Sequence, residues 1–198
     1  MKHLFIATRN KGKIKEIEAL LAGLVEQIST ATDYLDFPET VEDGATFEEN
    51  ALKKAREASL FTGLPVLADD SGLVVDALDG RPGVYSARFA GEGAGDGANN
   101  ARLLEDLKGI EADRRQAAFV CALAFVAPDG FELTFSARVG GRILDIPRGI
   151  CGFGYDPLFL VDGFDRTMAE LRLEEKNGIS HRGLAFRQFR DYLKEKSL

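Results

Sequence analysis

The stretch that decides the fold is AAFVCALAFVAPDGFELTFSARV, residues 117–139. Residues 117–127 are apolar, which is typical of a strand buried on both faces. Pro128-Asp129-Gly130 then supplies turn chemistry. From Phe131 to Val139, apolar side chains recur at every second position, as on a half-buried strand. The stretch therefore predicts a long hairpin.

The N-terminal part of the chain adds a strand and two helices to this hairpin. Residues 4–7 are typical of a short buried strand, and a polar turn follows them. A helix is expected next, because apolar residues recur at helical spacing: Ile14, Ile17, Leu20 and Leu21. Thr46 and Glu49 form a capping box that predicts the start of a second helix. Its inner face would carry Phe47, Ala51, Ala55 and Ala58.

The remaining elements complete an α/β pattern. Residues 66–68 predict a buried strand that ends at Asp69-Asp70-Ser71-Gly72. The glycine-rich residues 91–97 predict a loop, and residues 98–107 a helix. A final helix is expected from Ser180, with an inner face of Leu184, Ala185, Phe189, Tyr192 and Leu193. We expect one α/β domain over residues 1–198, with a long antiparallel component instead of a regular doubly wound sheet.

Composition argues against several classes of protein. A net charge of −7 disfavours a broad nucleic-acid surface, while 45% hydrophobic residues suffice for a sizeable core. The apolar run at 117–127 is too short for a membrane span, and that at 4–7 is too short for a secretion signal. Cys121 and Cys151 are not expected to pair. We expect a cytoplasmic protein that binds neither nucleic acid nor membranes.

Basic residues gather at two expected helix starts. Thr8-Arg9-Asn10-Lys11-Gly12-Lys13 places three cations where the helix dipole disfavours them. A bound anion would reverse that preference, because backbone N–H groups and lysines converge on it. The alternative is a solvated turn capped by Asn10. His181 and Arg182 begin the last helix in the same way, with Lys176 upstream, so an anionic ligand is favoured.

Carboxylates follow the strand at residues 66–68 and precede the second helix. Adjacent strand residues point to opposite faces, so Asp69 and Asp70 cannot readily serve one point directly. Glu42 could complete a Mg²⁺ site with Asp70, because Mg²⁺ prefers carboxylate oxygens. Lys54 could reach a phosphate from the second helix. The alternative for the aspartate pair is an Asx turn or helix cap.

A third candidate site is the turn Gly152-Phe153-Gly154-Tyr155-Asp156-Pro157. Its aromatic rings could stack on a base while Asp156 accepts from base N–H groups. Alternatively, the rings could cap the core. The three candidate sites indicate a phosphate and a base, but they name no reaction.

Six motifs in order resemble the inosine/xanthosine triphosphate pyrophosphatases. They are Thr8-x-Asn10-x-x-Lys13, Phe47-x-Glu49-Asn50-Ala51, Ala68-Asp69-Asp70-Ser71-Gly72-Leu73, Gly83-x-Tyr85-Ser86-Ala87-Arg88, Gly152-Phe153-Gly154-Tyr155-Asp156-Pro157 and Ser180-His181-Arg182-Gly183. Each motif is weak by itself, but six in this order are highly specific. The resemblance extends from residue 3 to about residue 193.

The resemblance implies an elongated, two-lobed α/β fold, with a mixed sheet, flanking helices and a central cleft. It also implies a homodimer that uses Mg²⁺ to hydrolyse ITP, dITP and XTP to the monophosphate and pyrophosphate. Asp70 would be the general base and a metal ligand, together with Glu42. The substrate would be bound by Thr8, Arg9, Asn10, Lys11, Gly12, Lys13, Lys54, Ser71, Phe153, Gly154, Tyr155, Asp156, Lys176, His181 and Arg182. Arg9 departs from the pattern, because bacterial relatives often have glycine there.

Two other functions remain open at this point. A phosphomonoesterase, or a pyrophosphatase for other nucleotides, would use the same Mg²⁺ and lysines. However, Asp69-Asp70-Ser71-Gly72 lacks the Asp-x-Asp spacing of haloacid-dehalogenase-type phosphatases. A nucleotide sensor would bind the same ligand without turnover. The released product distinguishes these alternatives.

Overall fold

The computed structural model describes residues 1–196, whose strands form one mixed, six-stranded sheet in the order β2-β1-β3-β4-β5-β6. The strands are β1 (His3–Ile6), β2 (Gln27–Thr30), β3 (Val66–Val75), β4 (Gln116–Val126), β5 (Glu132–Ile143) and β6 (Phe159–Val161). Strand β1 pairs in parallel with β2 and β3, whereas β5 pairs antiparallel with β6. Residues 127–131 connect the neighbouring strands β4 and β5, so the predicted hairpin is confirmed.

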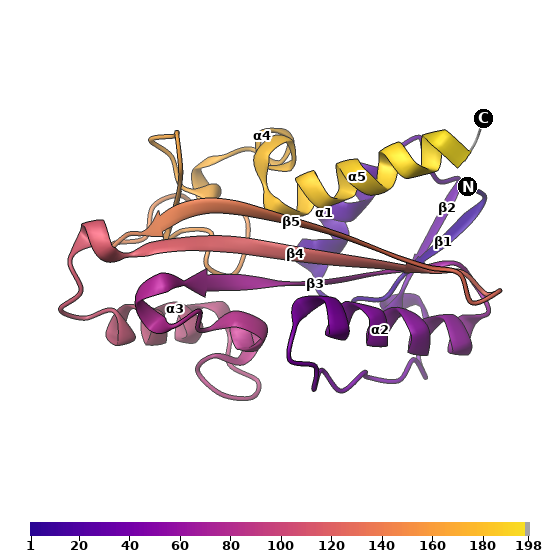
Figure 1. Ribbon diagram of the computed structural model, residues 1–198, viewed down its shortest axis with the longest axis horizontal. Helices are drawn as coiled ribbons and strands as arrows, with labels where there is room; N and C mark the ends of the chain where they lie inside the picture. Colours follow the sequence, from indigo (N-terminus) through magenta and orange to yellow (C-terminus); the bar gives the residue numbers. More distant parts are fainter. Residues whose placement is uncertain (197–198) are drawn as a thin grey trace. The chain divides into compact units, whose positions relative to one another are not determined.

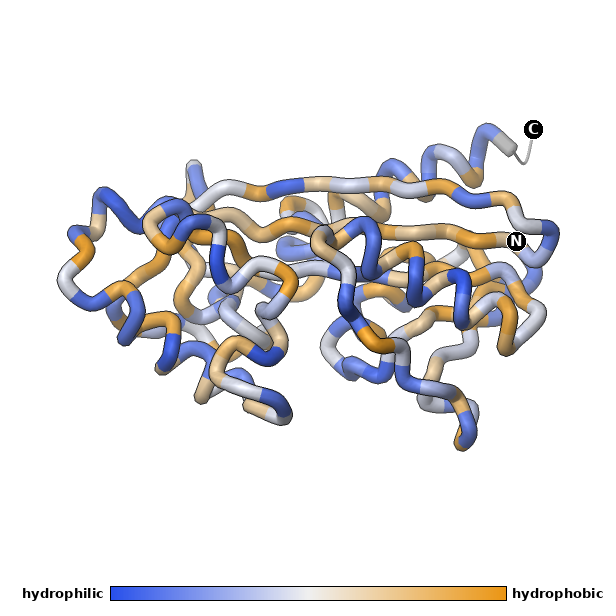
Figure 2. Tube along the Cα trace, turned by 60° about the horizontal axis from the view of Figure 1, so that its bottom comes forward, coloured by the Kyte–Doolittle hydropathy of each residue, from blue (hydrophilic) through white to orange (hydrophobic). Residues whose placement is uncertain are grey.

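Helices accompany these strands along the chain (Figure 1). The α-helices are α1 (Lys11–Leu21), α2 (Phe47–Thr62), α3 (Asp96–Asp106), α4 (Leu173–Ile179) and α5 (His181–Lys196). Short 3-10 turns are η1 (Ala31–Asp33), η2 (Asp76–Leu78), η3 (Gly83–Arg88), η4 (Ala112–Arg114) and η5 (Met168–Glu170). No helix within residues 1–196 is long and apolar enough to cross a membrane. Figure 2 shows hydrophobic residues along the strands and hydrophilic residues recurring along the helices.

The chain divides into two compact units, which we describe separately. Unit 1 comprises Met1–Asp70, Cys121–Ala137 and Gly183–Leu198. Unit 2 comprises Ser71–Val120 and Arg138–Arg182.

Unit 1 has helices on both faces of its strands. Side chains alternate between the two faces, and the buried side chains on both faces are apolar, so each face is covered by helices. Leu4 and Ile6 pack with Cys121 and Leu123 in the core beneath α1 and α5, and Phe186 belongs to the same cluster. The intervening residues form the opposite cluster with α2: Phe5, Ala7, Ala51, Ala55, Ala58, Ala122 and Ala124. In Figure 1, α2 and α5 accordingly lie on opposite sides of β3 and β4. Alanines on the α2 side allow that helix to approach the sheet closely.

Unit 2 has its own apolar core. Leu73 and Val75 of β3 pack there with Leu103 of α3 and Phe159 of β6. Phe119 of β4 joins them, with its ring centroid 4.5 Å from that of Phe159. Burying each of these large side chains contributes about 1.5–3 kcal/mol.

Both predicted helix starts in unit 1 are confirmed by their caps. Asn10 Oδ1 accepts from Lys13 N at 3.1 Å, so α1 begins with the N-cap that the alternative interpretation of this turn gave. Thr46 Oγ1 accepts from Glu49 N at 3.1 Å, and Glu49 Oε2 accepts from Thr46 N at 3.3 Å. The capping box therefore opens α2 as predicted.

Some predicted boundaries were wrong. Strand β3 continues through Asp69-Asp70-Ser71-Gly72 to Val75, so these residues do not follow a strand end. The strand persists because Leu73 and Val75 enter the core of unit 2. Helix α3 begins at Asp96, two residues before the predicted start, so it includes the end of the glycine-rich stretch. Elements β2, β6 and α4 were not predicted, because they are too short for a clear period.

Candidate functional site

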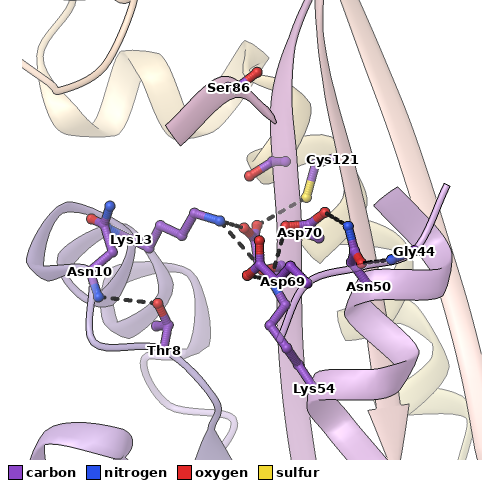
Figure 3. A network of polar contacts seen from close by, with 12 residues as sticks. Thr8, Asn10, Lys13, Gly44, Asn50, Lys54, Asp69, Asp70, Ser86 and Cys121 are labelled. Carbon is purple, nitrogen blue, oxygen red and sulfur yellow. Dashed lines mark hydrogen bonds and ion pairs between the residues drawn. The ribbon is translucent and has the colours of Figure 1, made fainter. Parts of the chain in front are cut away.

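Strand β3 presents Asp69 and Asp70 to opposite faces, as the predicted alternation requires. Asp69 contacts Cys121 and Lys13 on the α1 side, whereas Asp70 contacts Lys54 on α2 (Figure 3). The aspartate carboxylates are almost fully buried, with the two residues 2% and 5% exposed. The correct face assignment therefore did not depend on where the strand ends.

The edge of β3 is available at Asp69 because β1 leaves it one step earlier. Ala7 N donates to Leu67 O at 3.0 Å, and the chain then turns away at Thr8. The next carbonyl on the same edge is that of Asp69. It accepts from Lys54 Nζ at 2.9 Å and from Lys13 Nζ at 3.4 Å. The end of β1 thus creates an acceptor for two lysines.

The Lys54 ammonium lies among three oxygen atoms. Its Nζ is 2.9 Å from Glu42 Oε1, from Asp69 O and from Asp70 Oδ1. An ammonium has three N–H donors, so these contacts use all of them. Burial opposes the charged form, but the charges of Asp70 and Glu42 outweigh it and raise the pKa of Lys54. Lys54 is therefore a buried group whose charged form is stabilised by the neighbouring carboxylates.

The Asp70 carboxyl is held between opposing influences. Burial raises its pKa above the ordinary value, while the positive charges of Lys54 and Lys13 act in the opposite direction. The negative charge of Glu42 adds to the rise. A carboxylate with a raised pKa is a stronger base, which suits proton abstraction.

Lys13 is held at the start of α1 by an ion pair with the carboxylate of Asp69. The same carboxylate accepts from Cys121 Sγ at 3.2 Å. Lys13 and Lys54 therefore converge on one residue of β3 from two different helices (Figure 3).

The oxygen atoms around Lys54 suit a hard cation. Glu42, Asp70 and the Asp69 carbonyl already surround one positive charge, and oxygen donors are what Mg²⁺ prefers. Among residues 1–196, no three His, Cys, Asp or Glu side chains gather as a metal cluster. Mg²⁺ usually needs only one or two carboxylates, completed by water and phosphate. The residues present therefore fit a magnesium ion.

The turn before α1 is closed by its own hydrogen bonds. Thr8 Oγ1 accepts from Asn10 N at 3.2 Å, and Asn10 caps Lys13 N. The amides of Lys11 and Gly12 lie in the first helical turn, where no intrahelical acceptor exists. Arg9 is directed elsewhere, because its guanidinium donates to Phe37 O at 2.5 Å and lies 5.6 Å from the Phe37 ring centroid.

In unit 2, Asp156 and Lys176 form a buried ion pair. Lys176 Nζ lies 2.5 Å from Asp156 Oδ2, and both side chains are 4% exposed. Asp156 Oδ2 also accepts from Phe153 N at 3.0 Å. A Cβ at Gly152 would lie 2.0 Å from this oxygen, so glycine is required there. Asp156 therefore shapes the turn that carries Phe153.

Two cations and a hydroxyl group gather with Phe153. Lys176 Nζ is 4.8 Å from the Phe153 ring centroid, and Arg182 Cζ is 5.6 Å from it. Arg182 is 1% exposed and donates to Ser71 Oγ at 2.7 Å. His181 is 4% exposed and stacks on Phe119, with ring centroids 4.8 Å apart. Ser71, Phe153, Asp156, Lys176 and Arg182 thus form a second group of contacts, which we call the polar group of unit 2.

Tyr155 and Gly154 are held by other elements of unit 2. Tyr155 belongs to the core, and its hydroxyl donates to Ser86 O at 2.9 Å. Gly154 N donates to Asp96 Oδ2 at 2.7 Å, and Gly154 O accepts from Asn100 Nδ2 at 2.9 Å. Asp96 and Asn100 were not predicted, although their i, i+4 spacing on one helix face was a readable signal.

Comparison with known proteins places these groups in context. The family model described as the Ham1 family matches residues 4–192. A dITP/XTP pyrophosphatase of Geobacter sulfurreducens is 58% identical over 193 residues, covering 98% of this chain and 97% of that protein. One from Exiguobacterium sibiricum is 53% identical, covering 93% of both chains.

Solved structures agree with the fold. The Ham1 protein from Coxiella burnetii has a TM-score of 0.88 at 42% identity, covering 98% of this chain and 100% of that chain. The Staphylococcus aureus Ham1 protein has a TM-score of 0.86 at 39% identity, with the same coverage. The predicted α/β class, with a mixed sheet and flanking helices, is confirmed.

Proposed function

Because this chain belongs to the Ham1 family, we propose that it hydrolyses ITP, dITP and XTP to the monophosphate and pyrophosphate. The resemblance noted in the sequence is thereby confirmed at the level of the family. The observation that carries the proposal is the Lys54 ammonium, bonded to Glu42, Asp69 and Asp70. Together, these residues provide a carboxylate that can act as a base, oxygen atoms that can hold a cation, and a positive charge.

In this proposal the residues of unit 1 bind the triphosphate and take part in its cleavage. The amides of Lys11 and Gly12 at the start of α1 would bind phosphate oxygens, as helix N-termini do. Lys13 and Lys54 would offset the negative charge that develops during cleavage. Mg²⁺ held by Glu42 and Asp70 would neutralise triphosphate charge and polarise the α-phosphoryl group.

Asp70 would act as the general base. It would take a proton from the water whose oxygen forms the new bond to the α-phosphorus. The bond between the α-phosphorus and the bridging oxygen then breaks, and pyrophosphate leaves with that electron pair. Lys13 and Lys54 would stabilise this leaving group from α1 and α2.

The polar group of unit 2 is our candidate for purine recognition. Lys176 and Arg182 supply donors beside the Phe153 ring, which suits a keto oxygen. An amino group at that position would leave a buried donor unpaired, at a cost of about 1–3 kcal/mol. GTP shares the 6-keto group, so its rejection would have to act at purine position 2. We further propose Mg²⁺ as the ion, a homodimer and a cytoplasmic location, because the family resemblance implies them.

The test is product release from dITP, ITP, XTP, GTP and ATP, with Mg²⁺ or with a chelator. We expect metal-dependent pyrophosphate release from the first three and little from GTP and ATP. Asp70→Asn should lower kcat by at least about a hundredfold while nucleotide binding is partly kept. Release of orthophosphate alone would indicate a phosphomonoesterase. Equal rates of pyrophosphate release from all five nucleotides would contradict purine selectivity. Nucleotide binding without release of any product would indicate a sensor.

A further inference from the structure

Asn50 contacts the proposed base from the inner face of α2. The residue is completely buried, and its Nδ2 donates to Asp70 Oδ2 at 3.3 Å. Lys54, one helical turn later, donates to the other oxygen, Asp70 Oδ1, at 2.9 Å. Helix α2 therefore engages both oxygens of one carboxylate with two different donors (Figure 3).

The direction of the Asn50 amide is fixed by its other partner. Asn50 Oδ1 accepts from Gly44 N at 2.8 Å. A backbone N–H can only donate, so the amide oxygen must face Gly44 and the NH₂ group must face Asp70. The carboxylate of Asp70 thus meets a neutral donor at one oxygen and an ammonium at the other.

Gly44 approaches this amide more closely than any other residue type could. A Cβ at position 44 would lie 2.7 Å from Asn50 Oδ1 and 2.9 Å from Glu49 Cβ. The segment that carries Glu42 is thereby linked through Gly44 to the side chain that contacts Asp70. Asn50 therefore connects Asp70 with the backbone segment that carries Glu42, the other candidate metal ligand.

We propose that Asn50 is a positioning residue for the reaction. It orients the Asp70 carboxylate by donating to Oδ2, and Gly44 holds the Asn50 amide in the donating direction. The consequence for turnover rests on the proposed function. The contact itself does not, so the two can be tested separately.

The first test compares Asn50→Asp with Asn50→Ala in the Mg²⁺-loaded enzyme. Asn50→Asp keeps an acceptor for Gly44 N but replaces the donor that faces Asp70 by an oxygen. We expect both variants to lower kcat for dITP by about tenfold or more, with KM close to the parent's value. Gly44→Ala should lower kcat less, because it only displaces the amide. If Asn50→Asp keeps kcat within about twofold, Asn50 merely holds the Gly44 segment and the proposal fails.

The second test needs neither metal nor turnover. Asn50→Asp places two carboxylates in contact, so it should destabilise the metal-free protein toward denaturant. Combining it with Asp70→Asn exchanges the two side chains and restores one N–H···O contact. We expect the double variant to unfold at a higher denaturant concentration than Asn50→Asp. If Asn50→Asp lowers the unfolding free energy equally in the parent and in Asp70→Asn, the proposed contact between the two residues is wrong.

A matched asparagine supplies the control. Asn99 is 3% exposed and also bridges two groups, accepting from Ala90 N at 2.8 Å and donating to Ala87 O at 3.1 Å. Asn99→Asp should cost the same stability with or without Asp70→Asn. If the parent releases no pyrophosphate at all, the proposed function fails, while the denaturant comparison still decides whether Asn50 contacts Asp70.

Discussion

Single residues of β3 contact several partners through both their side chain and their backbone. Asp69 is the clearest case, because its carboxylate pairs with Lys13 and accepts from Cys121 while its carbonyl accepts from Lys54. The carbonyl contacts survive any side-chain change, whereas the ion pair does not. Asp69 is therefore expected to place Lys13 without taking part in the reaction itself.

Replacing Asp69 by asparagine should weaken the binding of the triphosphate. Lys13 would lose its buried counter-ion and its fixed position, so we expect KM for dITP to rise by about tenfold. Steady-state kinetics and urea unfolding measure the two effects. Asp43→Asn is the control, because Asp43 pairs with Lys53 at an exposed position, where an ion pair contributes little to stability. Similar KM values for the two variants would argue against a role of Asp69.

At the scale of elements, short helices are held by carboxylates at their first turns. Helix α4 supplies Lys176 to the ion pair with Asp156. Glu175 accepts from Arg172 N at 3.1 Å and from Arg166 at 3.0 Å. These hydrogen bonds, that to the Arg172 amide first, lower the pKa of Glu175 from 4.5 to about 2. The ionised form is therefore favoured by folding.

The acid stability of the protein should reflect this carboxylate. Because the folded pKa is depressed, its contribution is present above pH 4.5 and is lost as the pH falls from 4.5 toward about 2. Glu175→Gln should lower the unfolding free energy at neutral pH and flatten its decline over that window. Urea unfolding at several pH values measures this, with Glu174→Gln as the exposed neighbouring control. An unchanged pH profile in Glu175→Gln would contradict the assignment.

At the scale of the whole molecule, unit 1 carries the candidate phosphate groups and unit 2 the candidate purine groups. A nucleotide analogue that binds the folded protein should stabilise it, and a fragment that offers fewer contacts should stabilise it less. At a ligand concentration of 100 times Kd, binding to the folded state adds about 2.7 kcal/mol. For a chain of this size each kcal/mol raises Tm by about 2–4 °C.

Thermal unfolding with a non-hydrolysable dITP analogue and Mg²⁺ tests this expectation. We expect Tm to rise by about 5–10 °C, and pyrophosphate or deoxyinosine alone to give smaller shifts. The matching dATP analogue controls for purine selectivity. An equal rise with both analogues would contradict selection by the keto group.

Several features were readable because they depend on neighbours within a few residues. The capping box of Thr46 and Glu49, the Asn10 cap and the hairpin at residues 117–139 all express local geometry. The alternation along β3 likewise assigned Asp69 and Asp70 to opposite faces. The family could be identified from six ordered motifs, because the residue types in a motif and the order of the motifs can be read directly from the sequence.

Tertiary structure alone decided which groups meet. Asn50, Gly44 and Asp70 are joined by hydrogen bonds between residues up to twenty positions apart, and no periodicity encodes such a contact. The length of β3 was likewise decided by the core that Leu73 and Val75 enter, and the lysine contacts of the Asp69 carbonyl by where β1 ends. By itself, the sequence determined the local elements and the family; packing determined the partners, because burial and hydrogen bonding act between segments that only folding brings together.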